Sequence, residues 1–505
     1  MRVTLINESA YPYSRGGAGA WCDQLVHRLP DVAFDLVSLV ATGTEPVVWR
    51  LPDNVASLTA FPLWEPSARH RHRSGRRARA QFRPLLWDLL RCLLSDRIEI
   101  AGARFGDVLR GLFEFAARED LSAALRSEDS LTILASAWSE QWSKVDQPGP
   151  NLLDAGTALQ LLDRSLRPLS QPPRPADVVH CVSNGLAVLP ALAAKWTHGS
   201  AILLAEHDVY LRERYLTGRR NQYRWPVKAL HLAFLRQLCS HAYHEAAVIV
   251  TGNVDARRWA RKLGADPRII RTVHSGIDPA AFPAIQGEPR DPTISWAGRI
   301  DPVKDLETLL RAFALVHRGL PTSRLRLFGD PTPDTEDYLR RCQRLAADLG
   351  IDRAVAFEGR ALRTRDAYAA GSVVVLSAIS ESFPRTLIEA MTSGRACVAT
   401  DVGGVAEAMG DAGWLVPPRD PAAMAQACLA LLRNAAIRTR LGAAARSRAL
   451  SGLTLDRAIN TFREIYNELA PGRPLPAGVQ IPRPRSANGS QVDQQHGLPS
   501  TSVPS

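Results

Sequence analysis

Residues 380–394 read SESFPRTLIEAMTSG and carry two glutamates, Glu381 and Glu389. Pro384 favours the first turn of a helix, so we expect Glu381 in the loop before that helix and Glu389 about one and a half turns along it. A carboxylate on an apolar helix face costs free energy unless a polar group meets it. Solvated or capping glutamates are the ordinary interpretation of an isolated pair. The sharper hypothesis is that both face one cleft and bind vicinal hydroxyls, as in a ribose or a hexose.

The segments around this stretch alternate between strand and helix patterns. The strands predicted in the second half of the chain are 293–298, 325–329, 354–359, 373–377, 396–400 and 413–417. Gly403 and Gly404 are expected to open a further helix, with Glu407 beyond them. Such alternation is typical of a doubly wound α/β domain with a parallel sheet.

The first half shows the same alternation with one interruption. Its predicted strands are 3–7, 34–40, 176–183, 201–207, 246–252 and 269–278. Residues from about 65 to 170 show helical patterns without clear strands, and we interpret them as a helical insertion. The sequence therefore predicts two doubly wound domains.

Composition marks the domain boundaries. The segment 278–292, DPAAFPAIQGEPRDP, is a proline-rich joint, so we expect an N-terminal domain at 1–285 and a C-terminal domain at 286–455. A helix at 456–470 is expected to pack back on the N-terminal domain. The tail 471–505 is rich in Pro, Ser, Gly and Gln and is expected to be disordered.

Length and composition indicate a soluble globular protein with more than one core. The 505 residues are 46% hydrophobic and 22% charged, and the seven cysteines have no CxxC spacing, which argues against a disulfide framework or a zinc site. No run of about 18 apolar residues indicates a membrane span, and MRVTLINES has no signal-peptide pattern. We therefore expect a cytoplasmic protein.

The net charge of +11 is partly concentrated in residues 69–83, RHRHRSGRRARAQFR. This run is either a solvated basic segment or a docking patch for an anionic polymer or membrane, which would place the protein at the inner face of the membrane. It lacks interleaved aromatic residues at its centre and no recognised nucleic-acid-binding motif accompanies it, so no nucleic-acid partner is expected.

Cations and glycines follow other predicted strands. Arg299 and Lys304, in AGRIDPVKD, come after the strand 293–298, at the sheet edge where the glutamates are expected. An arginine fork and a lysine point charge suit a diphosphate, and surface salt bridging is the alternative. GGAGA, at 16–20, enters a helix after the first strand, so its N–H groups can approach an anion. It lacks the GxGxxG spacing, and a tight turn is the alternative.

Residues 379–421, which contain the two glutamates, closely resemble the signature of retaining family 4 glycosyltransferases of the GT-B fold. The resemblance implies two Rossmann-like domains that face each other across a cleft. AGRIDPVKD and HSGID (274–278) add to the match, although many members have asparagine where this chain has Ser275. The pieces 6–26 and 203–214 resemble the subgroup typified by the Pel exopolysaccharide glycosyltransferase, PelF.

The resemblance implies a sugar nucleotide between the domains. Arg299 and Lys304 would bind the diphosphate, Glu389 the ribose, and Glu381 the transferred sugar or its phosphate. The donor-binding residues implied in this way are Gly16, Gly17, Ala18, Arg299, Lys304, Glu381, Ser382, Phe383, Pro384, Leu387 and Glu389. No metal or other cofactor is implied, since protein cations and amides stabilise the leaving diphosphate.

His207 ends a strand in EHD, where the family often places a histidine near the donor sugar. With Arg299, Lys304 and Glu381 it completes the expected catalytic set, although a lone histidine is often structural. The expected acceptor-side residues are His180, Glu206 and Asp208. RER, at 212–214, is either a solvated helix face or a group that positions an acidic acceptor.

The expected activity is therefore metal-independent, retaining transfer of a hexose, with glucose from UDP-glucose preferred, to a polysaccharide or glycolipid in exopolysaccharide biosynthesis. The expected partners are a UDP-sugar, a saccharide or lipid-linked acceptor, and a membrane-bound export partner. One alternative is another GT-B nucleotide-sugar enzyme, such as an epimerase, or a glycoside phosphorylase. The other is a non-catalytic scaffold in an export complex, against which the intact pairs of glutamates and cations argue.

Overall fold

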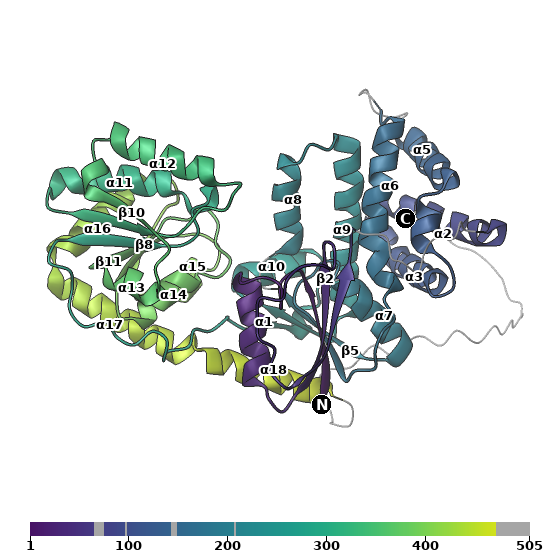
Figure 1. Cartoon of the computed structure of the whole chain (residues 1–505), viewed down its shortest axis with the longest axis horizontal. Coiled ribbons are helices and arrows are strands. Elements are labelled where there is room, and N and C mark those ends of the chain that lie inside the picture. Colours follow the sequence, from purple (N-terminus) through teal and green to yellow (C-terminus); the bar gives the residue numbers. More distant parts are fainter. Residues whose placement is uncertain (65–74, 96–97, 143–148, 207–208, 471–505) are drawn as a thin grey trace, which may run out of the picture.

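The chain forms two lobes, each built on a parallel β-sheet (Figure 1). The computed structural model describes residues 1–64, 75–95, 98–142, 149–206 and 209–470. The expected tail, 471–505, lies outside these ranges. The prediction of an α/β fold with two Rossmann-like domains is confirmed.

Seven of the described strands form the sheet of the N-terminal lobe, in the order β3-β2-β1-β4-β5-β6-β7. They are β1 (Arg2–Glu8), β2 (Ala33–Val40), β3 (Val55–Pro62), β4 (Val178–Cys181), β5 (Ala201–Glu206), β6 (Val248–Thr251) and β7 (Ile270–Thr272). The strand order reverses between β1 and β4, and ligands of such sheets bind beyond the carboxyl ends of the strands at this point. The sequence prediction missed β3, an edge strand whose residues are mostly half-buried and include Ser57 and Thr59.

Helices cover this sheet and extend from it as the insertion. Those next to the sheet are α1 (Gly17–Arg28), α7 (Val188–His198), α8 (Tyr210–Arg220), α9 (Trp225–Glu245), α10 (Val254–Lys262) and the short η2 (Pro267–Ile269). The insertion comprises α2 (Arg76–Leu94), α3 (Ile98–Ala116), α4 (Leu121–Leu125), α5 (Glu128–Trp142), α6 (Leu152–Leu166) and η1 (Arg167–Ser170). It shares one core with α9, in which Leu86, Leu109 and Phe234 are fully buried.

The basic run continues into α2. Arg76, Arg77, Arg79 and Arg83 are exposed, while Ala78, Phe82 and Leu86, at helical spacing, are buried. This part of the run is thus the solvated face of an amphipathic helix. Residues 69–74 lie outside the described part of the chain.

Six described strands form the sheet of the C-terminal lobe, in the order β10-β9-β8-β11-β12-β13. They are β8 (Thr293–Ala297), β9 (Arg324–Phe328), β10 (Val355–Gly359), β11 (Val373–Leu376), β12 (Ala396–Thr400) and β13 (Trp414–Val416). The helices are η3 (Pro302–Lys304), α11 (Leu306–Gly319), α12 (Glu336–Asp348), η4 (Asp352–Ala354), α13 (Thr364–Ala369), α14 (Arg385–Thr392), α15 (Val405–Met409), α16 (Pro421–Arg433) and α17 (Ala435–Gly452). Each predicted strand of this half is present.

The chain crosses between the lobes twice, and the two crossings are hydrogen-bonded to each other. The N–H of Ile277 donates to the carbonyl oxygen of Leu453 at 2.9 Å, and the N–H of Leu455 donates back to Ile277 at 3.0 Å. A Cβ at Gly276 would overlap the backbone of Thr454, so this approach requires glycine. The crossings therefore form one joint rather than two independent linkers.

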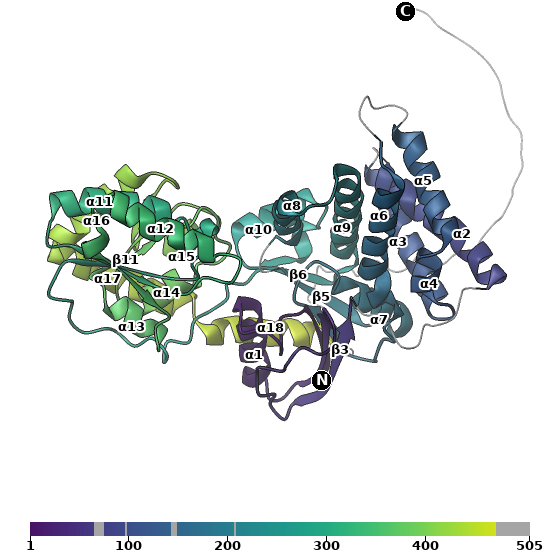
Figure 2. The ribbon, with the colours of Figure 1, turned by 45° about the horizontal axis from the view of Figure 1, so that its top comes forward.

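After the second crossing, α18 (Leu455–Leu469) returns to the N-terminal lobe (Figure 2). Its apolar face buries Phe462 and Tyr466 against the core of the sheet, where the ring centroids of Trp21 and Phe462 are 5.4 Å apart.

All seven cysteines are buried free thiols. Among the described helices, none has both the length and the apolar composition that a bilayer span needs.

Candidate functional site

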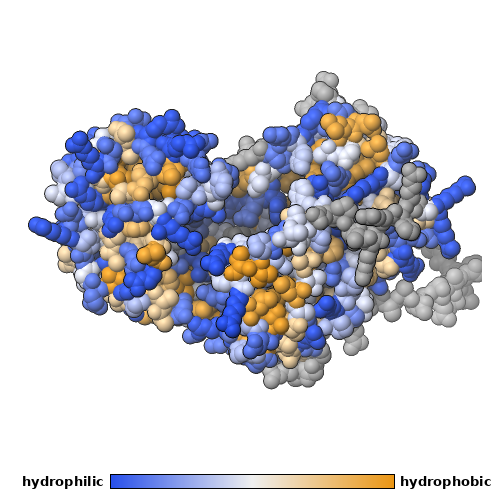
Figure 3. All heavy atoms as spheres, in the orientation of Figure 1, coloured by the Kyte–Doolittle hydropathy of each residue, from blue (hydrophilic) through white to orange (hydrophobic). Residues whose placement is uncertain are grey.

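A notch with mainly hydrophilic walls separates the two lobes on the face shown in Figure 3. Hydrogen bonds cross between the lobes beside it. Asn253 Nδ2, after β6, donates to the carbonyl oxygen of Ser382 at 2.5 Å, and Arg212 Nη2, in α8, donates to Ser380 Oγ at 3.2 Å. Both partners lie in the loop after β11. The carboxyl ends of the two sheets therefore meet at this cleft.

Lys304 and Glu381 meet at the carboxyl ends of the strands of the C-terminal sheet. Lys304 Nζ forms an ion pair with Glu381 Oε2, and the two side chains are 21% and 13% exposed. The backbone explains the contact, because the N–H of Ile379 donates to Val303 O at 2.9 Å and Ser377 Oγ donates to Lys304 O at 2.7 Å. These bonds join η3 to the loop after β11. A partly screened ion pair at a cleft wall is a polar contact that an anionic ligand can rearrange.

Glu389 meets its polar partner inside the lobe. Helix α14 begins at Arg385, next to Pro384, and Glu389 is only 8% exposed. Tyr368 Oη, from α13, donates a hydrogen bond of 2.7 Å to Glu389 Oε2. Burial raises the pKa of Glu389 above its ordinary value, although the Tyr368 hydrogen bond and the charge of Arg385 oppose this shift. The carboxyl group is thus held in place by a buried tyrosine.

The other residues of the expected donor set differ in exposure. Leu387 is 1% exposed and belongs to the core beneath α14, and Pro384 is buried as well. Phe383 is partly buried against the same core. Arg299 remains exposed, 3.2 Å from Asp301, whose side chain also caps η3. Arg299 therefore has most of its guanidinium available to solvent or ligand.

The glycine-rich loop forms the N-terminus of α1 in the N-terminal lobe. Gly16 is the N-cap and makes no side-chain cap, and Gly16, Gly17 and Ala18 are exposed. The first N–H groups of a helix lack intrahelical partners, so this end can accept an anion. The position that sterically requires glycine is Gly19, where a Cβ would overlap the carbonyl oxygen of Ser14.

Glu407, in α15, joins three segments across the cleft. Its Oε2 accepts a hydrogen bond of 2.7 Å from the N–H of Val254, and its Oε1 lies 2.6 Å from His274 Nε2. Burial alone would raise the pKa of Glu407, but the bonds from His274 and Val254 lower it below the ordinary value. A charged Glu407 therefore holds the C-terminal lobe against α10 and the start of the joint.

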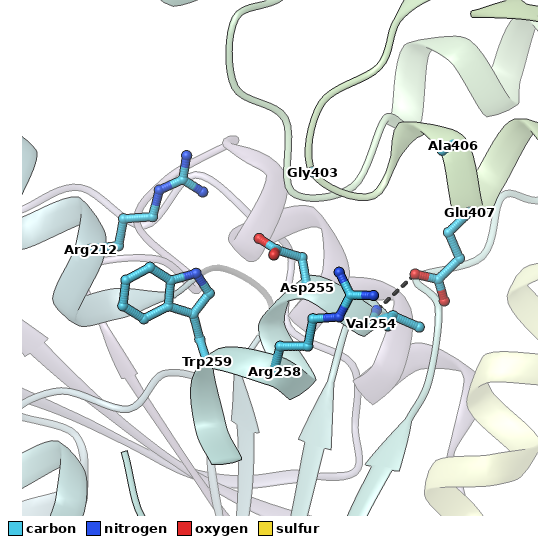
Figure 4. Close-up of a pocket in the computed structure, with 8 residues that line it drawn as sticks. All are labelled: Arg212, Val254, Asp255, Arg258, Trp259, Gly403, Ala406 and Glu407. Atoms are coloured by element: carbon cyan, nitrogen blue, oxygen red, sulfur yellow. Dashed lines mark hydrogen bonds between the residues drawn. The ribbon is translucent and has the colours of Figure 1, made fainter. Parts of the chain in front are cut away.

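A pocket of about 690 Å³ opens beside this contact (Figure 4). Arg212, Asp255, Arg258 and Trp259 line it from the N-terminal lobe, and Gly403 and Glu407 line it from the C-terminal lobe. Gly403 has φ +55°, and a Cβ there would overlap the carbonyl oxygen of Glu381. The pocket wall thus adjoins the backbone of Glu381.

Residues 1–268 match the model of a domain of unknown function, DUF3492, which covers more than half of the chain. The chain belongs to this family. Residues 291–434 match the model described as glycosyl transferases group 1, so the C-terminal lobe is a group 1 domain of the GT-B fold.

Among curated proteins, the chain is similar to the D-inositol 3-phosphate glycosyltransferase of Streptomyces bingchenggensis (strain BCW-1), with 31% identity over 45% of this chain and 53% of the relative. The corresponding protein of Frankia alni is 38% identical over 37% of this chain and 50% of the relative. The chain thus spans about half the length of the curated relatives it matches.

Solved structures share the fold at low identity. Sucrose-phosphate synthase from Thermosynechococcus elongatus has a TM-score of 0.60 and 17% identity, over 93% of this chain and 98% of that protein. Anabaena HepE in complex with UDP and glucose has a TM-score of 0.57 and 13% identity, over 92% of this chain and 99% of that protein. These likenesses show that the chain shares the fold of these proteins.

The acceptor-side candidates have different surroundings from those expected. His180 is fully buried in β4, with Nδ1 2.7 Å from Tyr466 Oη and its ring stacked on Phe462. Glu206 is also buried, and it accepts hydrogen bonds from Tyr243 Oη and from the N–H of Tyr210. Both have the packing of structural residues, because helices cover both faces of these strands and supply their partners.

His207 and Asp208 lie outside the described residues, so their roles stay predictions. Within the described ranges, no three His, Cys, Asp or Glu side chains gather into a group that fits a metal ion. Metal independence likewise stays a prediction.

The sequence prediction missed Asn253, Trp259 and Tyr368. The signal for Asn253 was its place directly after a strand, in TGN, as a helix cap.

Proposed function

We propose that the chain is a retaining hexosyltransferase that transfers glucose from UDP-glucose to a polysaccharide or glycolipid acceptor in exopolysaccharide biosynthesis, as in the PelF subgroup. The observation that carries the proposal is the Lys304–Glu381 ion pair at the cleft edge of a group 1 domain. Beside it lie an exposed arginine, Arg299, and a buried carboxyl group, Glu389. The choice of donor draws support from HepE, a protein of the same fold that was solved with UDP and glucose.

The proposed chemistry assigns a separate task to each group. Lys304 and Arg299 offset the negative charge that develops on the leaving diphosphate. When the diphosphate takes up Lys304, the Glu381 carboxylate is released to accept hydrogen bonds from the transferred sugar. Glu389 accepts hydrogen bonds from the ribose, held in place by Tyr368. The N-terminus of α1 contributes backbone N–H groups from the opposite lobe.

Closure of the lobes at the joint would align the acceptor hydroxyl with the anomeric carbon and exclude water. Retention requires attack on the face from which the diphosphate leaves, and His207 is the residue we assign beside the donor sugar. We place the enzyme in the cytoplasm, at the inner face of the membrane beside an export partner.

The test is a UDP-release assay with Lys304→Met and a matched control, Lys228→Met, which removes a half-buried cation from α9 whose Nζ donates a hydrogen bond to the carbonyl oxygen of Asn221. We expect turnover to fall on the order of 100-fold in Lys304→Met, because a cation that stabilises the leaving group is lost, and to stay unchanged in the control. The anomer of the product, read by NMR, tests retention. Equal turnover in both variants, or a product with inverted configuration, would contradict the proposal.

A further inference from the structure

The pocket beside Glu407 contains an aromatic platform. Trp259 projects from α10 into it, and Figure 4 shows the Arg212 side chain above the indole ring. Lys262 Nζ lies 5.8 Å from the ring centroid. An indole face offers a large apolar surface with little conformational entropy to lose, and this suits the C–H face of a sugar ring. The donor site proposed above makes no use of this tryptophan.

The pocket also contains two arginines, Arg212 and Arg258, that pair with no carboxylate in the part of the chain that the structure describes. Among the described residues Arg258 forms no ion pair, and the one hydrogen bond of the Arg212 side chain goes to the neutral Ser380 Oγ. A guanidinium presents a planar fork that binds a carboxylate or a phosphate with two parallel hydrogen bonds. Because Arg212 and Arg258 come from different helices, they can bind one anion from two directions.

Among the described residues, the carboxylates of the pocket form no ion pair with these arginines. Glu407 is engaged by His274 and by the N–H of Val254. Asp255 forms no ion pair with the described residues and can accept hydrogen bonds from sugar hydroxyls. Further along α10, Lys262 is exposed and adds positive potential around the opening.

We propose that this pocket binds the acceptor, and that the acceptor is an anionic saccharide. Its sugar ring lies on Trp259, and its carboxylate or phosphate ester is bound by Arg212 and Arg258. Since Gly403 joins the pocket wall to the backbone of Glu381, an acceptor seated here directs a hydroxyl toward the transferred sugar. This inference rests on the proposed function and names the acceptor class of the same site.

The experiment measures calorimetric affinity, in the presence of UDP, for three probes: a galacturonate oligosaccharide, a hexose phosphate and a neutral malto-oligosaccharide. Wild type is compared with Arg258→Gln, Trp259→Ala and a matched control, Arg261→Gln. The control removes the same charge from an exposed position on α10 that does not line the pocket. UDP binding is measured separately for each variant.

At least one anionic probe is expected to bind wild type more tightly than the neutral one. The anionic probe that binds more tightly shows whether the acceptor carries a carboxylate or a phosphate. Arg258→Gln is expected to weaken that probe about 10-fold, as the loss of a charge-assisted hydrogen bond requires. Trp259→Ala should weaken the binding of all three saccharides, and Arg261→Gln should change the affinity for none of them. The inference is overturned if wild type binds UDP but has the same affinity for neutral and anionic probes. It is also overturned if Arg258→Gln and Arg261→Gln bind the anionic probe with equal affinity. If wild type binds no UDP, it is the proposed function that fails.

Discussion

Replacing Tyr368 by phenylalanine tests how the buried Glu389 is held. The change removes a hydrogen bond of 2.7 Å from Tyr368 Oη to Glu389 Oε2 and leaves the aromatic ring in place. A hydrogen bond to a charged group contributes about 1.5–3 kcal/mol, so we expect the free energy of unfolding at neutral pH to fall by that amount. Donor affinity should fall with it, because a less well-held carboxyl group is a poorer partner for the ribose.

The loss of unfolding free energy in Tyr368→Phe should depend on pH. Burial raises the pKa of Glu389, so this group contributes its full stability below the ordinary pKa of a glutamate, and the contribution is lost as pH rises through the folded-state pKa. The Tyr368 hydrogen bond opposes the shift by stabilising the carboxylate. Without it the folded-state pKa rises further, so the deficit of Tyr368→Phe should be small in acid and should grow as pH increases.

The assay is urea unfolding of wild type and Tyr368→Phe from pH 4.5 to pH 8. The matched control is Tyr338→Phe, which removes a buried tyrosine oxygen that accepts a hydrogen bond from the N–H of Leu306 instead of binding a carboxylate. We expect the control to lose about 1 kcal/mol at every pH in this range. A pH-independent deficit in Tyr368→Phe, or no deficit, would refute the reasoning.

Three further substitutions test the joint and the contact between the lobes. Gly276→Val should cost about 1–3 kcal/mol, because its side chain overlaps Thr454, and limited proteolysis should detect an opened joint. Phe462→Ala should lower the free energy of unfolding by about 3–5 kcal/mol, measured by thermal unfolding, since it empties the core under α18. The lowered pKa of Glu407 means that its stabilisation is present above the ordinary glutamate pKa and lost as pH falls through the folded-state value. Glu407→Gln should therefore open the lobes at neutral pH, and an unchanged radius of gyration in X-ray scattering would contradict this.

The fold could be predicted from the sequence where buried strands follow each other. The central strands of the C-terminal lobe, such as β11 and β12, are apolar runs between helical patterns, and the start of α14 was marked by Pro384. The edge strand β3 escaped prediction because half-buried strands need no continuous apolar run. The meeting of Lys304 with Glu381 followed from topology, since the carboxyl ends of parallel strands share one edge.

Other parts of the site depend on packing that a linear pattern does not encode. His180 and Glu206 stand near strand ends, but only the register of the sheet and the return of α18 determine that they are buried. The partner of Glu389 comes from α13, a different helix, so spacing alone could not identify Tyr368. Trp259 belongs to a pocket that forms only when the two lobes meet.

The central claim is that a UDP-sugar binds beside Glu389. The most direct measurement is calorimetric titration with UDP-glucose, GDP-glucose and ADP-glucose, without added metal, of wild type, Glu389→Ala and the isosteric Glu389→Gln. Glu336→Ala, which removes an exposed carboxylate from α12, is the matched control. We predict that UDP-glucose alone binds wild type and the control equally, and that both Glu389 variants bind it at least about 10-fold more weakly. If the Glu389 variants bind UDP-glucose as tightly as wild type does, or if wild type binds none of the three donors, the account is contradicted.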